Sequence, residues 1–255
     1  MQTRIECFPC FLRQTVIALQ QLTGDQAVQE DVIRAVLPII SVADTSRPPA
    51  YTTTFIHRLI RDRLQVDPFK KIKYDYNEIA LRLYPSLKEK VKRSSDPLRT
   101  ASRLAIAGNV IDFGIFTSID IEGSINRALE TSIAVDDYLS FRRSVIEAEE
   151  VLYLLDNAGE IVFDRLLIEE LMSLGKKVKA VVKGSPVLND VTGEWTSPGF
   201  RDEFNRATLI ISKGQGNFET LIGTEKNAYF LFQSKCEVVS KELGQSLGSM
   251  FLKSS

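Results

Sequence analysis

The stretch VLYLLDNAGEIVFD, residues 151–164, shows how the second half of the chain folds. Its first five residues are apolar or aromatic and predict a buried strand, and the amphipathic segment that begins at Glu160 predicts a helix. Between them stand Asp156, Asn157 and Gly159, in place of an ordinary turn. A buried strand that leads into a helix is typical of a parallel α/β unit. The acid and the amide at its end are not required by the fold and point to a site.

The same pattern continues to the end of the sequence. Short apolar runs rich in β-branched and aromatic residues recur at KVKAVV (177–182), ATLIIS (207–212), AYFLF (228–232) and SMFLK (249–253), with amphipathic stretches between them. Strands that alternate with helices predict a mostly parallel sheet covered on both faces. We therefore expect residues 151–255 to form a Rossmann-like α/β/α sandwich.

The first half of the chain has a helical pattern instead. Apolar residues recur at helical spacing in CFLRQTVIALQQL (10–22) and AVQEDVIRAVLPIISVA (27–43), and strand signals are few. These features predict an all-α N-terminal domain over residues 1–150, with the boundary near Glu150. The expected fold class is α/β, with a helical domain followed by the sandwich.

The composition excludes several classes of protein. The 255 residues carry a net charge of −1 without a basic block, so we expect no nucleic-acid and no membrane partner. The sequence has no signal-peptide pattern and no apolar run near the roughly 18 residues that cross a bilayer, which predicts a cytoplasmic protein. The single histidine, His57, is expected to be a satisfied helix residue. Carboxylates, amides and lysines are left to carry any chemistry.

Unusual polar residues follow four successive predicted strands. They are Asp156, Asn157 and Glu160 after the first, Lys183, Asn189, Asp190 and Thr192 after the second, Lys213, Gly214, Gly216 and Asn217 after the third, and Lys235 and Cys236 after the fourth. Ligands of open parallel sheets bind beyond the carboxyl ends of the strands. We therefore expect these residues to meet at one edge of the sheet.

The residue types at this edge predict phosphate chemistry. Asp156, Asn157 and Asp190 offer hard oxygen ligands for one divalent ion, Mg²⁺, Mn²⁺, Co²⁺ or Ni²⁺, and are the predicted catalytic and metal-binding residues. The lysines offer positive charge to phosphate oxygens, and the glycines let backbone N–H groups approach an anion. The predicted substrate-binding residues are Lys183, Lys213, Gly214, Gly216, Asn217, Lys235, Asn109, Asp112 and Glu160.

Each motif has a simpler interpretation when it stands alone. DNAGE (156–160) could be a helix cap, NDVTG (189–193) a turn, and KGQGN (213–217) one of many glycine loops. Each lysine could be a solvated rim residue. Their joint placement at successive strand ends favours a site.

Asn109 and Asp112 share a helix face in GNVIDFG (108–114). They could reach the substrate or the metal, or they could form an interdomain hydrogen-bonding pair beside a closely packed Gly108. The sequence leaves both alternatives open.

Cys7 and Cys10 have the Cys-x-x-Cys spacing of zinc knuckles and thiol redox centres. A zinc site needs about four ligands, so a second metal site at Cys7, Cys10 and Cys236 would have to be assembled from both halves of the chain. We favour the alternative of reduced or buried thiols, because half a motif does not make a site.

Several motifs together resemble the damage-control phosphatase family, also known as domain of unknown function family 89. They are LLDNAGEIVFD (154–164), VVKGSPVLNDVT (181–192), ISKGQGNFE (211–219) and SKCEVV (234–239), and the upstream ECFPCFLRQ (6–14), DPFKKIKYDYN (67–77) and DPLRTASRLAIAGNVIDFG (96–114) resemble its prokaryotic branch. The resemblance covers nearly the whole chain. It implies a helical N-terminal region, an α/β/α domain and metal-dependent hydrolysis of phosphate monoesters, such as sugar phosphates and damaged or surplus phosphometabolites.

The resemblance also implies roles for particular residues. It places the family's metal-binding Asp-Asn pair on Asp156 and Asn157, and its later metal-binding Asp on Asp190. The family's C-terminal lysine looks like Lys235, although the Arg-Thr start of the eukaryotic motif is absent from FQSK (232–235). This departure leaves the substrate class open. A carboxyl methyltransferase activity, proposed for a eukaryotic branch, ranks low because nothing here matches an adenosyl-methionine loop.

Two alternative functions come from other classes. The chain could be a non-catalytic protein that binds a nucleotide or phosphometabolite, or a structural metal-binding interaction module built around Cys7 and Cys10. Asp156 and Asp190 favour catalysis, because anion binding would gain little from two acids without a metal. The physiological substrate, the preferred ion, a covalent phospho-enzyme and the oligomeric state are left open by the sequence.

Overall fold

The structure, a computed structural model, describes residues 1–110, 121–183 and 200–255. The helices are α1 (Cys7–Leu22), α2 (Gln26–Ser41), α3 (Pro49–Leu64), α4 (Lys70–Lys92), α5 (Pro97–Val110), α6 (Ile121–Glu130), α7 (Tyr138–Glu147), α8 (Glu160–Ser173), α9 (Phe200–Arg206), α10 (Gln215–Leu221) and α11 (Glu237–Glu242). The strands are β1 (Ile133–Asp136), β2 (Glu150–Leu154), β3 (Lys177–Val181), β4 (Ile210–Lys213), β5 (Ala228–Gln233) and β6 (Met250–Ser254). The predicted strands of the second half are therefore all present.

The six strands form one sheet in the order β1-β6-β5-β4-β2-β3. The four strands β3, β2, β4 and β5 run parallel to one another. Strand β6 is antiparallel to β5, and β1 is parallel to β6. The predicted α/β fold with a mostly parallel sheet is confirmed. Because β2, β3, β4 and β5 point the same way, their carboxyl ends share one edge.

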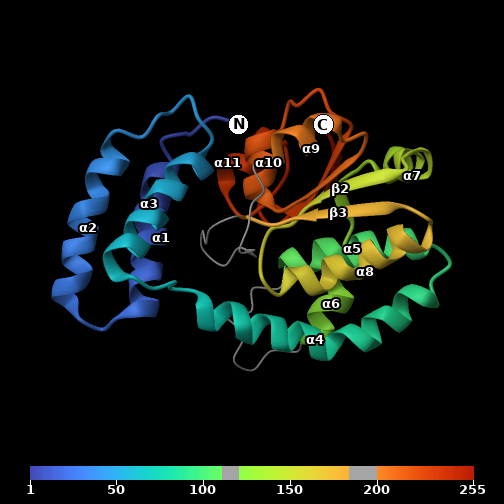
Figure 1. Ribbon diagram of the computed structural model, residues 1–255, viewed down its shortest axis with the longest axis horizontal. Coiled ribbons are helices and arrows are strands. Elements are labelled where there is room, and N and C mark those ends of the chain that lie inside the picture. Colours follow the sequence, from blue (N-terminus) through green and yellow to red (C-terminus); the bar gives the residue numbers. More distant parts are fainter. Residues whose placement is uncertain (111–120, 184–199) are drawn as a thin grey trace.

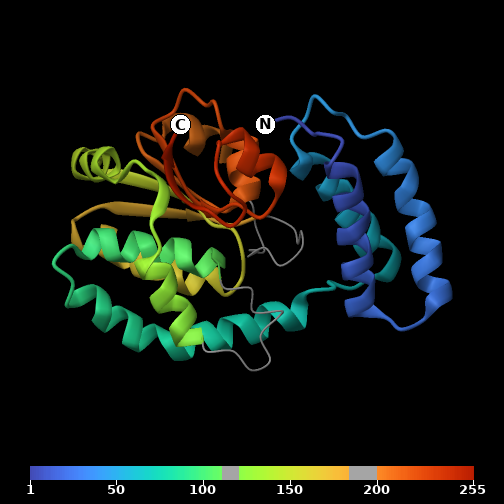
Figure 2. The ribbon, with the colours of Figure 1, turned by 180° about the vertical axis from the view of Figure 1, so that it is seen from behind.

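Helices cover both faces of this sheet, as the apolar strands predict. Successive strand residues alternate between the faces: Val151 and Tyr153 pack with α5 and α8, while Leu152 and Leu154 pack on the other face with Phe218 of α10. Figure 1 shows α5 and α8 on one side of the strands and α10 and α11 on the other, and Figure 2 shows the same layers from behind. The sheet is thus packed against helices on both faces.

The first three helices form a small bundle with a core of its own, to which Phe11, Val36 and Ile60 contribute. The Asp25 side chain caps α2 by accepting hydrogen bonds from two backbone N–H groups of its first turn. Helix α4 then leads from the bundle to α8 in the α/β part (Figure 1). Helix α3 of the bundle also contacts α10, so the bundle faces the edge of the sheet where α10 begins.

The prediction that residues 1–150 are all-α is wrong at one place. Residues Ile133–Asp136 form β1, which pairs with β6 at the border of the sheet. A four-residue strand between two helices carries too short a pattern to be distinguished from a helix by periodicity, and its pairing with the end of the chain supplies what the local sequence lacks. The division into two domains near residue 150 stays a prediction.

None of the helices in the described ranges is both long enough and apolar enough to cross a membrane.

Candidate active site

The polar residues predicted at the strand ends largely meet at the shared carboxyl edge. They surround a cavity of about 560 Å³ between this edge and the helical bundle. Its lining residues are Glu6, Cys7, Cys10, Phe11, Gln14, Pro49, Ala50, Thr53, Thr54, Asp156, Asn157, Lys183, Gln215, Gly216, Glu219, Lys235, Cys236, Glu237, Val238 and Lys241. The parallel strands and the bundle therefore place the predicted acid, amide and two of the predicted lysines around one space.

Asp156 and Asn157 lie just beyond β2 and are almost fully buried. Oδ1 of Asp156 forms an ion pair with the ammonium of Lys183, 3.0 Å away, and Oδ2 accepts a hydrogen bond of 2.9 Å from Nδ2 of Asn157. The turn that follows is bonded to a residue far away in the sequence, because the backbone N–H of Gly159 donates to Oδ1 of Asn77 in α4. Acid, amide and lysine thus form one connected group at the cavity wall.

Gly214 makes room for the Asp156 carboxylate. A Cβ atom at Gly214 would lie 1.9 Å from Oδ2 of Asp156, and the residue has a φ of +81°. No other amino acid fits either requirement. The glycine was predicted to let the backbone approach an anion, and the anion that it approaches here is the carboxylate of Asp156.

Glu160 and Asn109 support this group from behind. Oε1 of Glu160 accepts hydrogen bonds from Nδ2 of Asn157 at 2.6 Å and from Nδ2 of Asn109 at 2.7 Å. Oδ1 of Asn109 in turn accepts from the backbone N–H of Gln233 in β5. Asn109 thus forms hydrogen bonds with α8 and β5, and a Cβ at the neighbouring Gly108 would lie 2.9 Å from Phe163 of α8. Its predicted partner Asp112 lies outside the described residues, so the choice between the two alternatives stays a prediction.

Lys213 does not occupy the position predicted for a substrate-binding lysine. Its side chain is fully buried, and its ammonium pairs with Asp164 at 2.8 Å and lies 3.6 Å from Oε2 of Glu160. Asp164 also accepts a hydrogen bond from the hydroxyl of Tyr153. A fully buried ammonium cannot reach a substrate, so Lys213 is part of the interior charge network beneath Asn157 and Glu160.

Burial and charge shift the pKa values in this network. Burial raises the pKa of Asp164 to about 6, although the neighbouring Lys213 opposes the shift. Burial alone would lower the pKa of Lys213, but the carboxylates of Asp164 and Glu160 outweigh it and the pKa is raised. Lys213 therefore stays charged, and its charge is matched inside the protein rather than by a ligand.

The remaining predicted residues lie in the glycine loop after β4 and in the loop after β5, and they divide into two groups. Gly216 and Lys235 line the cavity. The backbone N–H of Lys235 donates to Oε1 of Gln215, which ties the ends of β4 and β5 together. Asn217 instead donates from Nδ2 to the carbonyl oxygens of Leu155 and Lys213, and so braces the loops.

Two predicted residues, Asp112 and Asp190, lie outside the described residues, as do Asn189 and Thr192. The predicted convergence of Asp190 with Asp156 and Asn157 therefore stays a prediction. Among the residues that are described, no three His, Cys, Asp or Glu side chains lie close enough together to hold a metal ion. The part of the predicted metal site that is described consists of one carboxylate and one amide at the cavity wall, a hard oxygen set that fits a divalent ion completed by further ligands.

The three cysteines all line the cavity, from α1 and from the start of α11, but they are free thiols. Sγ of Cys10 accepts a weak hydrogen bond from Gln14, and Sγ of Cys236 accepts one from Gln215. Burial is the main cause that raises the pKa of both Cys7 and Cys10. Among the described residues the three thiols do not form a set of metal ligands, and the second metal site stays a prediction.

The chain is similar to known proteins over nearly its whole length. Residues 3–196 and 193–251 match the damage-control phosphatase ARMT1-like domain. The chain belongs to this family. An uncharacterised protein from Methanocaldococcus jannaschii is 33% identical over 97% of this chain and 93% of that protein. A damage-control phosphatase from Archaeoglobus fulgidus is 30% identical over 97% of both chains. The resemblance drawn from the sequence motifs is confirmed.

A solved structure confirms the fold within the family. The crystal structure of a protein of the domain of unknown function 89 family from Pyrococcus horikoshii matches this chain with a TM-score of 0.91 and 27% identity. The match covers 100% of this chain and 99% of that chain. The helical bundle and the sheet are therefore a shared family architecture.

One wall of the cavity was missed by the sequence analysis. Gln14 of α1 and Thr53 and Thr54 of α3 bring amide and hydroxyl groups to the space opposite Asp156. Within their helices these residues carry no signal that separates them from ordinary helix-surface residues. Only the packing of the bundle against the sheet edge identifies them.

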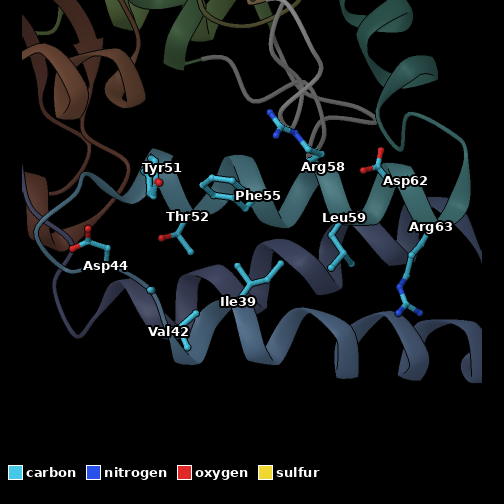
Figure 3. Close-up of a pocket in the computed structure, with 11 residues that line it drawn as sticks. Ile39, Val42, Asp44, Tyr51, Thr52, Phe55, Arg58, Leu59, Asp62 and Arg63 are labelled. Atoms are coloured by element: carbon cyan, nitrogen blue, oxygen red, sulfur yellow. The ribbon is translucent and has the colours of Figure 1, made fainter.

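A second hollow, of about 650 Å³, lies along α2 and α3. Figure 3 shows its side chains, among them the apolar Ile39 and Phe55 and the charged Arg58 and Asp62. It contains none of the residues predicted to carry chemistry. The cavity at the sheet edge is therefore the candidate active site of this family member.

Proposed function

We propose that this chain is a metal-dependent phosphatase that hydrolyses phosphate monoesters of small metabolites. The observation that carries the proposal is the group of Asp156, Asn157 and Lys183, which opens from the carboxyl edge of the sheet into a cavity. Membership of the damage-control phosphatase family supports it, and relatives from two archaea are named damage-control phosphatases.

Asp156 and Asn157 are the described residues that would hold the divalent ion, with Asp190 as the proposed third ligand. When bound, a divalent ion supplies positive charge to the phosphoryl oxygens and helps to activate the attacking water. The rigid strand end and the hydrogen bond between the two side chains keep both oxygen ligands in place before any ligand arrives. Two carboxylates and one neutral amide would bring the net charge around a divalent ion close to zero, which leaves room for an anionic substrate.

Lys183 and Lys235 are the proposed phosphate-binding residues. Lys183 already lies 3.0 Å from Asp156 and a third of its side chain is exposed, so its charge borders both the proposed metal ligand and the cavity. In the hydrolysis, the oxygen of water bonds to phosphorus as the ester P–O bond breaks, and the leaving alcohol takes up a proton. Positive charge near the equatorial oxygens stabilises the transition state of this step.

The opposite wall suits the alcohol portion of the ester. Gln14, Thr53 and Thr54 offer donors and acceptors, and the cavity of about 560 Å³ has the size of a small-molecule site. The proposed substrates are therefore small polar phosphate esters, such as sugar phosphates or damaged and surplus phosphometabolites.

The test is release of inorganic phosphate from a panel of sugar phosphates and cofactor fragments, with Mg²⁺, Mn²⁺, Co²⁺ and Ni²⁺ compared. Chelation should abolish turnover. Asp156→Ala and Asp190→Ala should each reduce kcat/KM by at least about 1000-fold while the protein stays folded.

The matched control is Asp75→Ala, which removes an exposed acid of α4 whose described partner is Lys71 and should leave turnover intact. Phosphate release by Asp156→Ala at the wild-type rate would contradict the proposal. Binding of phosphate esters without release under any of the four ions would favour a non-catalytic binding protein.

A further inference from the structure

Glu160 stands among three donors and has little contact with solvent. Its Oε1 accepts from Nδ2 of Asn157 and from Nδ2 of Asn109, and the ammonium of Lys213 lies 3.6 Å from Oε2. The residue is 4% exposed. Oε1 therefore accepts two hydrogen bonds, while Oε2 has no hydrogen-bond partner among the described residues and faces the Lys213 ammonium as an ion pair.

The direction of these hydrogen bonds is set by the backbone. The N–H of Gln233 in β5 donates to Oδ1 of Asn109. A backbone N–H cannot become an acceptor, so Asn109 must present its nitrogen to Glu160. The backbone of β5 thus determines which side-chain atom of Asn109 accepts and which donates, and Asn109 donates to Glu160.

The orientation of the Asn157 side-chain amide is fixed by its hydrogen bonds to Glu160 and Asp156. Its Nδ2 donates both hydrogens, one to Oε1 of Glu160 at 2.6 Å and one to Oδ2 of Asp156 at 2.9 Å. If the amide were turned over, its oxygen would face two carboxylates. The oxygen Oδ1 accepts no hydrogen bond from the described residues, and Asn157 lines the cavity.

We propose that Glu160 is a positioning residue that fixes the Asn157 amide with its oxygen toward the cavity, where a hard divalent cation takes that oxygen as a ligand. This inference rests on the proposed metal-dependent function. It moves Glu160 from the substrate-binding role expected from the sequence to a role that acts through Asn157. It also explains the positions of Asn109 and the buried Lys213, because Asn109 donates to Oε1 of Glu160 and the Lys213 ammonium faces Oε2.

The reverse orientation would oppose metal binding. A turned Asn157 would present N–H groups, which carry partial positive charge, to the cation and would remove one of its oxygen ligands. Groups that orient a ligand typically change metal affinity by about 10- to 100-fold when they are altered. An effect of this size is expected here.

The substitution Glu160→Gln tests this inference, because glutamine has nearly the same shape as glutamate but replaces one accepting oxygen by a donating NH₂ group. The glutamine has one accepting and one donating end, yet both ends of the wild-type carboxylate face donors. If its oxygen faces Lys213, its NH₂ group meets that of Asn157, and Asn157 turns. Titration calorimetry with Mn²⁺ alone should show affinity weaker than wild type by about 10- to 100-fold.

Asp164→Asn is the matched control. It makes the same chemical change at another fully buried acid that pairs with Lys213, but the described contacts of Asp164 do not include Asn157. Mn²⁺ affinity should stay at the wild-type value in this variant. Wild-type affinity in Glu160→Gln would overturn the inference, and so would an equal loss in both variants, because that would show a general effect of the buried charges.

A measurement on the wild-type protein covers the case in which Glu160→Gln does not fold. In isotope-labelled protein, both side-chain amide protons of Asn157 should exchange slowly with solvent, before and after Mg²⁺ is added. The side-chain carbonyl carbon of Asn157 should shift when Mg²⁺ binds. A carbonyl signal that stays unmoved while Mg²⁺ binds, or a wild-type protein that binds neither ion, would overturn the inference. Phosphate release is measured separately and decides whether the proposed function stands.

Discussion

The Asp156 carboxylate packs directly over the α-carbon of Gly214. A Cβ atom at Gly214 would lie 1.9 Å from Oδ2 and 2.2 Å from Cγ of Asp156, far inside van der Waals contact. The two residues come from the ends of the neighbouring strands β2 and β4. The side chain proposed to hold the metal therefore depends on the absence of a side chain on the next strand.

Gly214→Ala should displace Asp156 and strain the backbone, because the position has a φ of +81°. We expect a loss of roughly 1–3 kcal/mol in unfolding free energy and a fall of at least about 100-fold in kcat/KM for phosphate release. The measurements are urea unfolding and steady-state kinetics.

Gly24→Ala is the control for this substitution. Nothing lies within 4 Å of a Cβ at Gly24, so both unfolding free energy and turnover should match those of the wild type. Normal turnover in Gly214→Ala would contradict the arrangement of the site.

Lys213→Met should destabilise the protein strongly, because it leaves Asp164 buried without its cation. Removing one partner of a buried pair typically costs about 3–5 kcal/mol. The pKa of Asp164, already raised to about 6 by burial, should rise further in the variant. A carboxyl group with a raised folded pKa loses stability as the pH rises toward that pKa. The unfolding free energy of the Lys213→Met variant should therefore lie further below that of the wild type at pH 8 than at pH 5.

The double variant Lys213→Met with Asp164→Asn removes both charges. It should recover part of the stability at pH 8, since no carboxylate is left without a partner. Urea unfolding of the three proteins at both pH values provides the measurement. Equal deficits at pH 5 and pH 8 in the single variant would show that the ion pair does not set the stability of this region.

Lys213 also shows where sequence reasoning reaches its limit. In KGQGN it stands at a strand end beside two glycines, a setting typical of a phosphate-binding lysine. Side chains alternate along β4, however, and Ile211 packs on the face covered by α8. Lys213 therefore points to α8, where Asp164 receives it. The alternation could have been read from the strand, but the acid that receives the lysine comes from another element.

The predictions that succeeded depend on patterns within a few residues. The apolar runs gave the strands, and their parallel order brought Asp156, Lys183 and Lys235 to one edge. The predictions that failed or were missed depend on packing between distant parts of the chain. Strand β1 needs β6 to become a strand, and the cavity wall at Gln14 exists because the bundle lies against the sheet edge.

His57 provides a test of the helical bundle that is independent of the active site. It is buried in α3, and its Nε2 atom has no hydrogen-bond partner among the described residues, so the expectation of a satisfied histidine is wrong in this detail. Burial lowers the pKa of His57 to about 4, and the nearby Arg61 acts in the same direction. The unfolded chain binds the proton near pH 6.5. Between pH 6.5 and pH 4 the unfolded state therefore holds more protons, and stability falls as the pH is lowered.

A shift of this size corresponds to about 3 kcal/mol of unfolding free energy lost between pH 6.5 and pH 4. His57→Leu should remove this component of the pH dependence, while the other titrating groups contribute equally to both proteins. Urea unfolding of wild type and variant at several pH values measures the unfolding free energy of each protein. As the pH falls, the unfolding free energy of the wild type should decrease relative to that of the variant. Parallel stability curves over this range would mean that His57 takes up its proton in the folded protein as easily as in the unfolded chain, and that the bundle core does not exclude its charge.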